Sequence, residues 1–290
     1  MEQILEGKTL AKKIREPLAE KVKTISAKLG RDINLLGICN KKDYASSIYM
    51  QKEVKAAEKL GIKGKIIEID DNTSVEEFIE IIKTASADKN LDALLIARPL
   101  PEKLENSNYT KHINSLIDID GISIDNMGKL YICKTFDDVK NINGFVPCTA
   151  LAVVKLLEYH NIDVNGKEIV VLGRSITVGK PLAHMLLAKN ASVKICHSRT
   201  KDITKSLSTA DIVISAIGRA KFLKKEMLKP NTIVIDVGTN EDEKGNFCGD
   251  VDFENIKNFA SAISPVPGGV GPVTLACLLE NIVISAGRNI

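Results

Sequence analysis

Residues 167–181 read KEIVVLGRSITVGKP, and this stretch decides the fold of the second half of the chain. The apolar run 169–172 is typical of a buried strand, and Gly173 follows directly after it. Pro181 fits the first turn of a helix, where its missing N–H group costs no hydrogen bond. The stretch therefore predicts a strand, a tight turn and a helix, which is the repeating unit of a parallel α/β fold.

The turn 173–179 also has the chemistry of a phosphate site. In a Rossmann-type unit, backbone N–H groups of such a turn and the positive end of the helix dipole meet a pyrophosphate. The spacing departs from GxGxxG, because Ser175 stands where the second glycine is expected and Gly179 comes later. The turn alone therefore indicates nucleotide binding but leaves a purely structural turn as the alternative.

The end of the next expected strand, residues 192–196, favours NADP over NAD. An NAD site usually has Asp or Glu here, which binds the ribose 2′-hydroxyl. This chain has His197, Ser198 and Arg199 instead, and Arg174 lies in the phosphate turn. Ser198, Arg199 and Arg174 can donate hydrogen bonds to a 2′-phosphate, which a carboxylate would repel. Arg199 considered alone is equally consistent with an exposed basic residue.

Two further strand ends are expected to border the nicotinamide, because ligands of open parallel sheets bind at the carboxyl ends of the strands. The strands are predicted at 211–217 and 232–237. The residues at or just beyond their ends are Ala216, Gly218, Gly238 and Thr239. The alternative is that these glycines serve only as turn residues.

The rest of the chain alternates between helix and strand in the same way. The patterns predict helices at 7–29, 46–60, 75–87 and 147–160, a last helix from Thr274, strands at 33–39, 65–69 and 93–97, and a loop at 118–126. Two β-α-β series predict an α/β protein of two α/β domains with mostly parallel sheets. One domain is expected to comprise 1–147 with 268–290, and the other, of Rossmann type, 148–267.

The composition narrows the class of protein. The chain has 290 residues, of which 44% are hydrophobic and 27% charged, as is typical of a soluble globular protein. A formal net charge of +3 without a dense basic block argues against nucleic acid as a partner. The six cysteines are scattered, so neither a metal site nor a disulfide framework is expected. We expect no signal peptide and no membrane-length apolar run, and hence a cytoplasmic protein.

The first domain offers polar candidates that are ambiguous by themselves. Tyr49, Lys52 and Glu53 share one face of the helix 46–60 by i, i+3 and i+4 spacing. A tyrosine beside a carboxylate can do polar chemistry in a cleft, but a half-buried tyrosine beside a solvated charged pair explains the pattern as well. Asp120, within the segment DIDG at 118–121, is equally consistent with an ordinary turn.

Taken together, these segments resemble the methylenetetrahydrofolate dehydrogenase/methenyltetrahydrofolate cyclohydrolase family over nearly the whole chain. The resemblance rests on ASSIY at 45–49, PLP at 99–101, DIDG at 118–121, PCT at 147–149, GRS at 173–175 with VGKP at 178–181, DVG at 236–238 and PVPGGVGP at 265–272. It implies a folate domain and an NADP domain with the active cleft between them, usually in a homodimer. The activity it implies is oxidation of 5,10-methylenetetrahydrofolate to the methenyl cation, which many members then hydrolyse to 10-formyltetrahydrofolate.

The resemblance also implies roles for individual residues. Tyr49 should stack on or border the folate and Asp120 should hold the pterin, so that Tyr49, Glu53 and Asp120 are the expected catalytic positions. The expected folate-binding residues are Tyr49, Pro99, Leu100, Asp120, Pro265, Pro267, Gly268 and Gly269. The expected NADP-binding residues are Thr149, Gly173, Arg174, Ser175, Val178, Gly179, Ser198, Arg199, Ala216, Gly218, Gly238 and Thr239.

Two positions depart from the family pattern. The family has a catalytic lysine four residues after the tyrosine, and this chain has Glu53 there; Lys55 matches a second lysine of the motif. The family loop Gln-Leu-Pro-Leu-Pro is Ala97-Arg98-Pro99-Leu100-Pro101 here, so the glutamine that partners the lysine is alanine. Lys52 is one position away, about 100° around the helix, and is expected to point elsewhere.

The two changes separate the two reactions. Oxidation spreads positive charge over the methylene carbon and its flanking nitrogens, which a nearby carboxylate stabilises. Hydrolysis needs proton transfer, which the family assigns to the lysine. We therefore expect the dehydrogenase to be retained and the cyclohydrolase to be weak or absent. The alternatives are a fully bifunctional enzyme in which Lys52 or Glu53 takes over the proton transfer, and a non-catalytic protein that binds folate and nucleotide.

Overall fold

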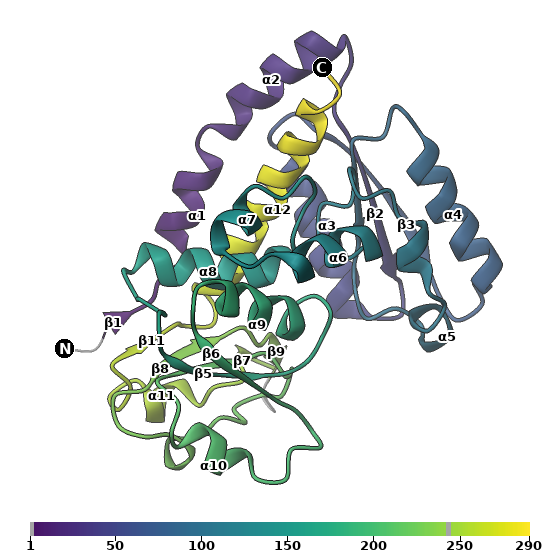
Figure 1. Cartoon of the computed structure of the whole chain (residues 1–290). Coiled ribbons are helices and arrows are strands. Elements are labelled where there is room, and N and C mark those ends of the chain that lie inside the picture. Colours follow the sequence, from purple (N-terminus) through teal and green to yellow (C-terminus); the bar gives the residue numbers. More distant parts are fainter. Residues whose placement is uncertain (1–2, 242–244) are drawn as a thin grey trace. The chain divides into compact units, whose positions relative to one another are not determined.

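The computed structural model describes residues 3–241 and 245–290, which form two compact units (Figure 1). We call them the amino-terminal unit and the phosphate-turn unit. The amino-terminal unit comprises Lys13–Lys129, Ile142–Val146 and Ala276–Ile290. The phosphate-turn unit comprises the chain up to Lys12, Leu130–Asn141 and Pro147–Leu275.

The amino-terminal unit is built on a three-stranded parallel sheet in the order β3-β2-β4. Its strands are β2 (Asn34–Asn40), β3 (Lys63–Ile69) and β4 (Ala93–Ile96). Its helices are α2 (Leu18–Leu29), α3 (Tyr44–Glu58), α4 (Val75–Ala87), α5 (Glu102–Glu105) and the 3-10 turn η1 (Tyr109–His112). Three helices have residues in both units: α1 (Lys8–Arg15), α6 (Ile124–Ile132) and α12 (Val270–Gly287).

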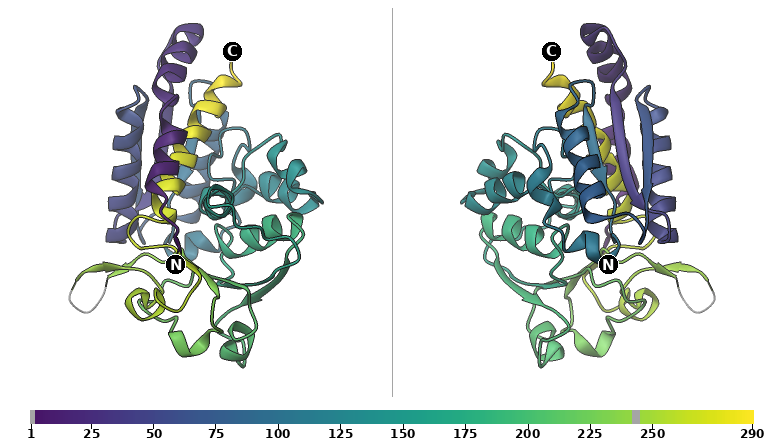
Figure 2. Two further views of the ribbon diagram at one scale, coloured as in Figure 1. Left: turned by 90° about the vertical axis from the view of Figure 1, so that its left-hand side faces the viewer. Right: turned by 90° about the vertical axis from the view of Figure 1, so that its right-hand side faces the viewer.

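The phosphate-turn unit is built on a six-stranded parallel sheet in the order β1-β11-β8-β7-β5-β6. Its strands are β1 (Gln3–Ile4), β5 (Glu168–Leu172), β6 (Ser192–Cys196), β7 (Ile212–Ser215), β8 (Ile233–Asp236) and β11 (Ala262–Ile263). Its remaining elements are α7 (Phe136–Lys140), α8 (Cys148–Tyr159), α9 (Gly179–Ala188), α10 (Ile203–Leu207), η2 (Lys225–Met227) and α11 (Phe253–Ile256). The antiparallel pair β9 (Asn240–Glu241) and β10 (Phe247–Cys248) extends away from this sheet (Figure 2).

The units differ from the two segments expected from the sequence. The chain up to Lys12 groups with the phosphate-turn unit, because β1 pairs in parallel with β11 at the edge of its sheet. Leu130–Asn141 belongs to the same unit, and α12 changes unit after Leu275. The sequence could not predict these differences, because two-residue strands and the point at which α12 changes unit leave no strong residue pattern.

Three expectations about helices were wrong. The helix expected at 7–29 is divided into α1 and α2, because Pro17 has no N–H group and restricts the residue before it. The loop expected at 118–126 ends early, since α6 begins at Ile124. The last helix, expected from Thr274, begins earlier, because α12 starts at Val270. By length and composition α12 could cross a membrane, contrary to the expectation of no membrane-length apolar run, and 61% of it is buried inside the structure.

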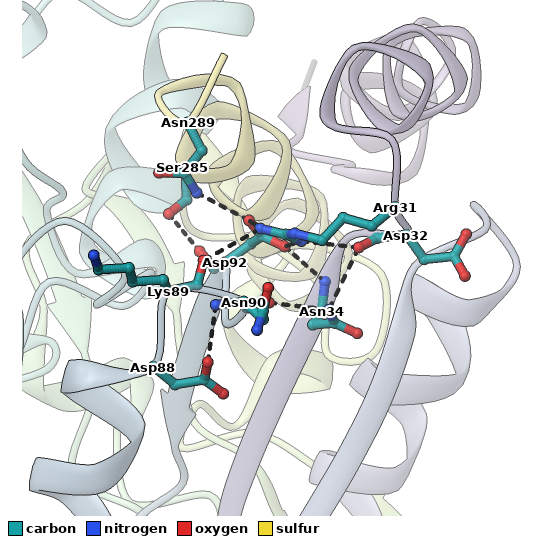
Figure 3. Close-up of polar contacts among 9 residues, drawn as sticks. All are labelled: Arg31, Asp32, Asn34, Asp88, Lys89, Asn90, Asp92, Ser285 and Asn289. Atoms are coloured by element: carbon teal, nitrogen blue, oxygen red, sulfur yellow. Dashed lines mark hydrogen bonds and ion pairs between the residues drawn. The ribbon is translucent and has the colours of Figure 1, made fainter.

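A polar cluster at the start of β4 joins α12 to the sheet of the amino-terminal unit (Figure 3). The carboxylate of Asp92 is fully buried, and it accepts hydrogen bonds from both terminal nitrogens of Arg31 at 2.7 and 2.9 Å. It also accepts from the backbone N–H of Asn34 and the side-chain amide of Asn289, each at 2.9 Å. The hydroxyl of Ser285 donates to the backbone oxygen of Asp92. The charge of Asp92 is therefore fully paired, as burial requires.

Candidate functional site

A cavity of about 320 Å³ lies at the carboxyl ends of β5, β6 and β7 in the phosphate-turn unit. Five residues expected to bind the cofactor line it: Gly173, Arg174, Ser175, Ser198 and Ala216. The sequence did not indicate the other lining residues, which are Leu172, Cys196, His197, Ile203, Ile217, Arg219 and Phe222. None of these described lining residues carries a carboxylate, so the cavity favours an anion.

The two glycines of the phosphate turn are required by close backbone approaches. Gly173 has a φ of +114°, and a Cβ atom there would lie 2.3 Å from the backbone oxygen of Ala216. A Cβ atom at Gly179 would lie 2.2 Å from the backbone oxygen of Gly173. Any larger residue would push these strand ends apart, so the turn can keep its shape only with glycine at both positions.

Ser175 accounts for the irregular spacing of the motif. Its hydroxyl oxygen accepts hydrogen bonds from the backbone N–H groups of Val178 and Gly179, at 3.1 and 3.3 Å, where α9 begins. A second glycine at this position would leave those donors without this partner. The hydroxyl therefore closes the turn, and it already occupies two of the N–H groups that a pyrophosphate was expected to meet.

The turn after β6 holds Ser198 and Arg199 at the surface. The backbone N–H of His197 donates to the hydroxyl of Thr200 at 3.0 Å, and that of Arg199 donates to Nδ1 of His197 at 3.1 Å. Both Ser198 and Arg199 are exposed, but only Ser198 lines the cavity. The structure therefore supports the place expected for Ser198 more than that expected for Arg199.

Two buried carboxylates, to which the sequence assigned no role, shape the neighbouring loops. Asp250 accepts from the backbone N–H groups of Ile217 and Arg219, at 2.7 and 2.8 Å. Asp236 accepts from the backbone N–H groups of Gly238, Asp250 and Val251, at 2.9 to 3.0 Å. Burial raises the pKa of Asp236 to about 6, against the opposing effect of these hydrogen bonds. The pair thus fixes the loops after β7 and β8.

The remaining expected cofactor residues lie outside the cavity lining. Thr149 is the second residue of α8, and Val178 precedes α9. Gly218, with a φ of +64°, follows β7, while Gly238 and Thr239 follow β8. A Cβ atom at Gly238 would lie 2.3 Å from the carboxyl carbon of Asp250, so this glycine has a packing role of its own.

In the amino-terminal unit, α3 carries Tyr49 and Glu53 close to the sheet. Gly37 and Gly64 allow this approach, because a Cβ atom would lie 2.3 Å from the sulfur of Met50 at Gly37 and 2.3 Å from Cγ1 of Val54 at Gly64. Buried residues of α3 face the strands, and Tyr49 and Glu53 are half-buried beside them. The helix is therefore fixed against β2 and β3, with both side chains at the border of its buried face.

The loop that carries Asp120 is fixed on both sides. The buried carboxylate of Asp118 accepts from the backbone N–H groups of Ile122 and Ser123 and from the amide of Asn126, at 2.7 to 3.1 Å. Burial raises the pKa of Asp118 although these hydrogen bonds oppose the shift. The loop is thus a rigid support that holds Asp120 in place.

Two contacts on the remaining sides complete this support. A Cβ atom at Gly121, where φ is +61°, would lie 2.7 Å from the backbone oxygen of Phe145. Asn281 donates to the backbone oxygen of Ile119 at 2.8 Å. The turn before α6 therefore tolerates only glycine at Gly121, and α12 reinforces it.

Glu53 has a strongly raised pKa. Burial raises its pKa to about 8, and the negative charge of Asp120 acts in the same direction. At neutral pH the free protein therefore holds Glu53 mostly protonated, which differs from the ionised carboxylate assumed from the sequence. A cation bound beside it would favour the ionised form again, because opposite charges lower the pKa of a carboxyl group.

Ala97 and Arg98, which stand in the loop where the family has glutamine, make contacts of their own. The backbone N–H of Ala97 donates to the oxygen of Ile38 at 2.8 Å, so Ala97 continues the pairing of β4 with β2. Arg98 donates to the hydroxyl of Tyr109 at 2.9 Å and pairs with Glu105, so it does not take the place of the missing glutamine.

Lys52 lies beside Tyr49, as their shared helix face predicts. Its Nζ lies 5.4 Å from the centre of the Tyr49 ring. The ammonium group is exposed and lies over the ring, an arrangement in which charge and ring attract each other. A lysine is therefore present near Tyr49, although from a different position of the helix.

The other expected folate residues lie in two proline-containing loops. Pro99 is exposed and Leu100 is buried, after the cis peptide bond between Arg98 and Pro99. In the phosphate-turn unit, the backbone N–H of Gly269 donates to the oxygen of Pro265 at 2.8 Å. The N–H of Gly7 donates to the oxygen of Gly268, which has a φ of +117° and follows the cis bond to Pro267.

Comparisons with known proteins agree with this arrangement. Residues 5–120 match the tetrahydrofolate dehydrogenase/cyclohydrolase catalytic domain, and residues 147–290 match the NAD(P)-binding domain of the same family. A curated relative from Elusimicrobium minutum, named bifunctional protein FolD, is 57% identical over 287 residues, which cover 99% of this chain and 100% of that protein.

Solved structures with the same fold include close relatives. The bifunctional enzyme FolD (methylenetetrahydrofolate dehydrogenase/cyclohydrolase) from Campylobacter jejuni superposes with a TM-score of 0.90 at 39% identity, and all of both chains is covered. The methylenetetrahydrofolate dehydrogenase-cyclohydrolase of Trypanosoma brucei, solved with NADP and an inhibitor, gives a TM-score of 0.88 at 32% identity, with 99% of this chain and 98% of that chain covered.

Proposed function

Because this chain belongs to the tetrahydrofolate dehydrogenase/cyclohydrolase family, we propose that it oxidises 5,10-methylenetetrahydrofolate to 5,10-methenyltetrahydrofolate with NADP. The observation that carries the proposal is the cavity at the phosphate turn, which joins Arg174, Ser175 and Ser198 and has no carboxylate among its described lining residues. Such a site accepts a 2′-phosphate that an NAD site would repel.

The folate is proposed to bind in the amino-terminal unit, at the face of α3 and at the loop of Pro99 and Leu100. Tyr49 supplies a ring against which the pterin can stack, and the rigid loop of Asp120 supplies a fixed hydrogen-bond acceptor. The remaining expected contacts are Pro99, Leu100, Pro265, Pro267, Gly268 and Gly269. Within the family, hydride transfer needs no proton transfer by the protein, so none of these residues has to act as acid or base.

The finer proposal is that hydrolysis of the methenyl product is weak or absent. The position of the family's catalytic lysine is Glu53, and its glutamine partner is Ala97. When the methenyl cation is bound, its charge favours ionised Glu53, and the resulting ion pair stabilises the cation as a ground state. This lowers the driving force for attack by water.

A fully bifunctional enzyme is the second candidate, and two observations favour it. Lys52 lies over the Tyr49 ring, and the pKa of Glu53 is raised to about 8, within the range in which a group can exchange protons at neutral pH. Either group would then replace the lysine. The relative from Elusimicrobium minutum carries the name of a bifunctional protein, which is consistent with this candidate.

Formation of NADPH tests the redox activity. Purified protein is mixed with methylenetetrahydrofolate and either NADP or NAD, and reduced cofactor is followed by absorbance. We expect rapid reduction with NADP and much slower reduction with NAD. A protein that is stabilised against heat by both ligands but forms no NADPH would be a non-catalytic binding protein, and the proposal would fail.

Cytoplasmic location and a homodimer complete the proposed function. The homodimer follows from the family resemblance and the cytoplasmic location from the expected lack of a signal peptide, and the small-molecule substrate requires no other partner. Light scattering of the purified protein at micromolar concentration tests the dimer, which should give twice the mass of the 31.6 kDa chain.

A further inference from the structure

The loop after β7 brings a further basic side chain to the cavity at the phosphate turn. Arg219 lines the same cavity as Arg174 and Ser198. These three residues follow β7, β5 and β6, which are neighbours in the sheet. Two arginines and one serine therefore line one cavity from three different strand ends.

The side chain of Arg219 is held in an ordered position. Its guanidinium carbon lies 4.9 Å from the centre of the Phe222 ring, and Phe222 lines the cavity as well. Stacking on an aromatic ring restrains the long arginine side chain, so that less conformational entropy is lost when it binds a ligand. The planar donors of the guanidinium group remain suited to a phosphate.

The backbone of Arg219 is held as well. Its N–H group donates to Oδ1 of Asp250 at 2.8 Å, and the N–H of Ile217 donates to Oδ2 of the same residue at 2.7 Å. Asp250 is fully buried, and its own N–H donates to Oδ1 of Asp236 at 3.0 Å. The base of the Arg219 side chain is therefore fixed from the interior of the unit.

We propose that Arg219 is a specificity-determining residue for the cofactor, whose guanidinium group binds the 2′-phosphate of NADP together with Arg174 and Ser198. In this class of fold the pyrophosphate meets the turn after the first strand, and the ribose 2′-substituent meets the end of the second. That second strand is β6, which ends beside Ser198. The inference rests on the proposed use of NADP. It adds a contact from the end of β7, which lies on the opposite side of β5 from β6.

The test compares ligands that differ only in the 2′-phosphate. Adenosine 2′,5′-bisphosphate and adenosine 5′-monophosphate are titrated by calorimetry, together with NADP and NAD, into the intact protein and three variants. Arg219→Gln removes the charge, Arg219→Lys keeps it, and Lys201→Gln removes an exposed charge that does not line the cavity.

We expect Arg219→Gln to weaken the two 2′-phosphorylated ligands about 10-fold, as for the loss of one charged hydrogen bond, and the other two ligands less than about 2-fold. Arg219→Lys should recover most of the loss, and Lys201→Gln should change little. Equal weakening of all four ligands would mean that Arg219 contacts the adenosine or the 5′-phosphate that they share, and no weakening would mean that it contacts none of them; either result overturns the inference. If the unchanged protein itself showed no preference for the 2′-phosphate, the proposed NADP use would fail instead.

Discussion

The phosphate turn and the face of α3 show how differently two sites of one chain can relate to the family they belong to. At the turn, Gly173, Ser175 and Gly179 are each required by a contact that the backbone makes. The position of α3 is fixed just as closely, because Gly37 and Gly64 allow the helix to approach the sheet. The side chains differ, however, since Glu53 and Ala97 stand where the resemblance implies lysine and glutamine. On our proposal, the backbone that supports this site is kept while the group that performs hydrolysis is replaced.

Restoring the residues that the family has at positions 53 and 97 should restore hydrolysis of the methenyl product. Glu53→Lys with Ala97→Gln should raise the rate of methenyl hydrolysis about 100-fold or more, the range expected for general acid–base catalysis. Glu53→Lys alone should restore little, because its amine would have no partner. The rate is measured from the loss of methenyl absorbance with pure methenyltetrahydrofolate.

The single variant Ala97→Gln is the matched control for that experiment. If it raised the hydrolysis rate as much as the double change, the position of Glu53 would not limit the reaction. If the double variant bound folate normally and still hydrolysed no faster, the loss would have another cause.

One added methyl group should disrupt the phosphate turn. Gly173→Ala places a Cβ atom 2.3 Å from the oxygen of Ala216 at a residue with a φ of +114°. The turn must then open, and we expect NADP affinity to fall about 100-fold, since one methyl group here costs several hydrogen bonds to the phosphates. Gly128→Ala is the control, because it has a normal φ and no atom within 4 Å of the added carbon. Calorimetric NADP affinity within a factor of three of the unchanged protein would contradict the role of the turn.

The smallest expected effect comes from the raised pKa of Glu53, which makes the free energy of unfolding depend on pH. The pKa of Glu53 is about 8 in the folded protein and about 4.3 when unfolded, so the folded state binds the proton more tightly. The free energy of unfolding therefore falls as the pH rises from about 4 to 8, and the loss is complete above that range. Glu53→Gln removes this loss, so the stability of the variant relative to the unchanged protein should rise by about 2–3 kcal/mol between pH 6 and 8.5.

Urea unfolding at the two pH values measures that gain. Glu58→Gln, a change at an exposed glutamate of the same helix, is the control and should show no such gain. A pH-independent difference between the Glu53→Gln protein and the unchanged protein would show that Glu53 titrates normally in the folded state.

The sequence was most informative where one local pattern decides one local structure. The strand, turn and helix at 167–181 follow from apolar spacing, Gly173 and Pro181, and α4 and β6 have the predicted bounds. Two-residue strands such as β1 and β11 could not be predicted, because they are defined by their partners and not by their own residues. Pro17 carried a clear signal for the break between α1 and α2.

The site was predictable only in part for the same reason. Arg174 and Ser198 lie in a recognisable motif, whereas Arg219 lines the cavity from a distant loop, which Asp250 holds through the backbone N–H of Arg219. The protonation of Glu53 depends on burial and on the charge of Asp120, which is far away in the sequence. Its spacing from Tyr49 gave the right position on the helix but not the state of the group.

If the protein oxidises methylenetetrahydrofolate but does not hydrolyse the methenyl product, that product must accumulate during the reaction. The protein is mixed with methylenetetrahydrofolate and NADP, and NADPH and methenyltetrahydrofolate are followed in the same sample against the rate of spontaneous methenyl hydrolysis. We predict that methenyltetrahydrofolate accumulates in step with NADPH and then decays at the spontaneous rate. Formation of NADPH with prompt enzymatic conversion of the methenyl product to 10-formyltetrahydrofolate would contradict the claim.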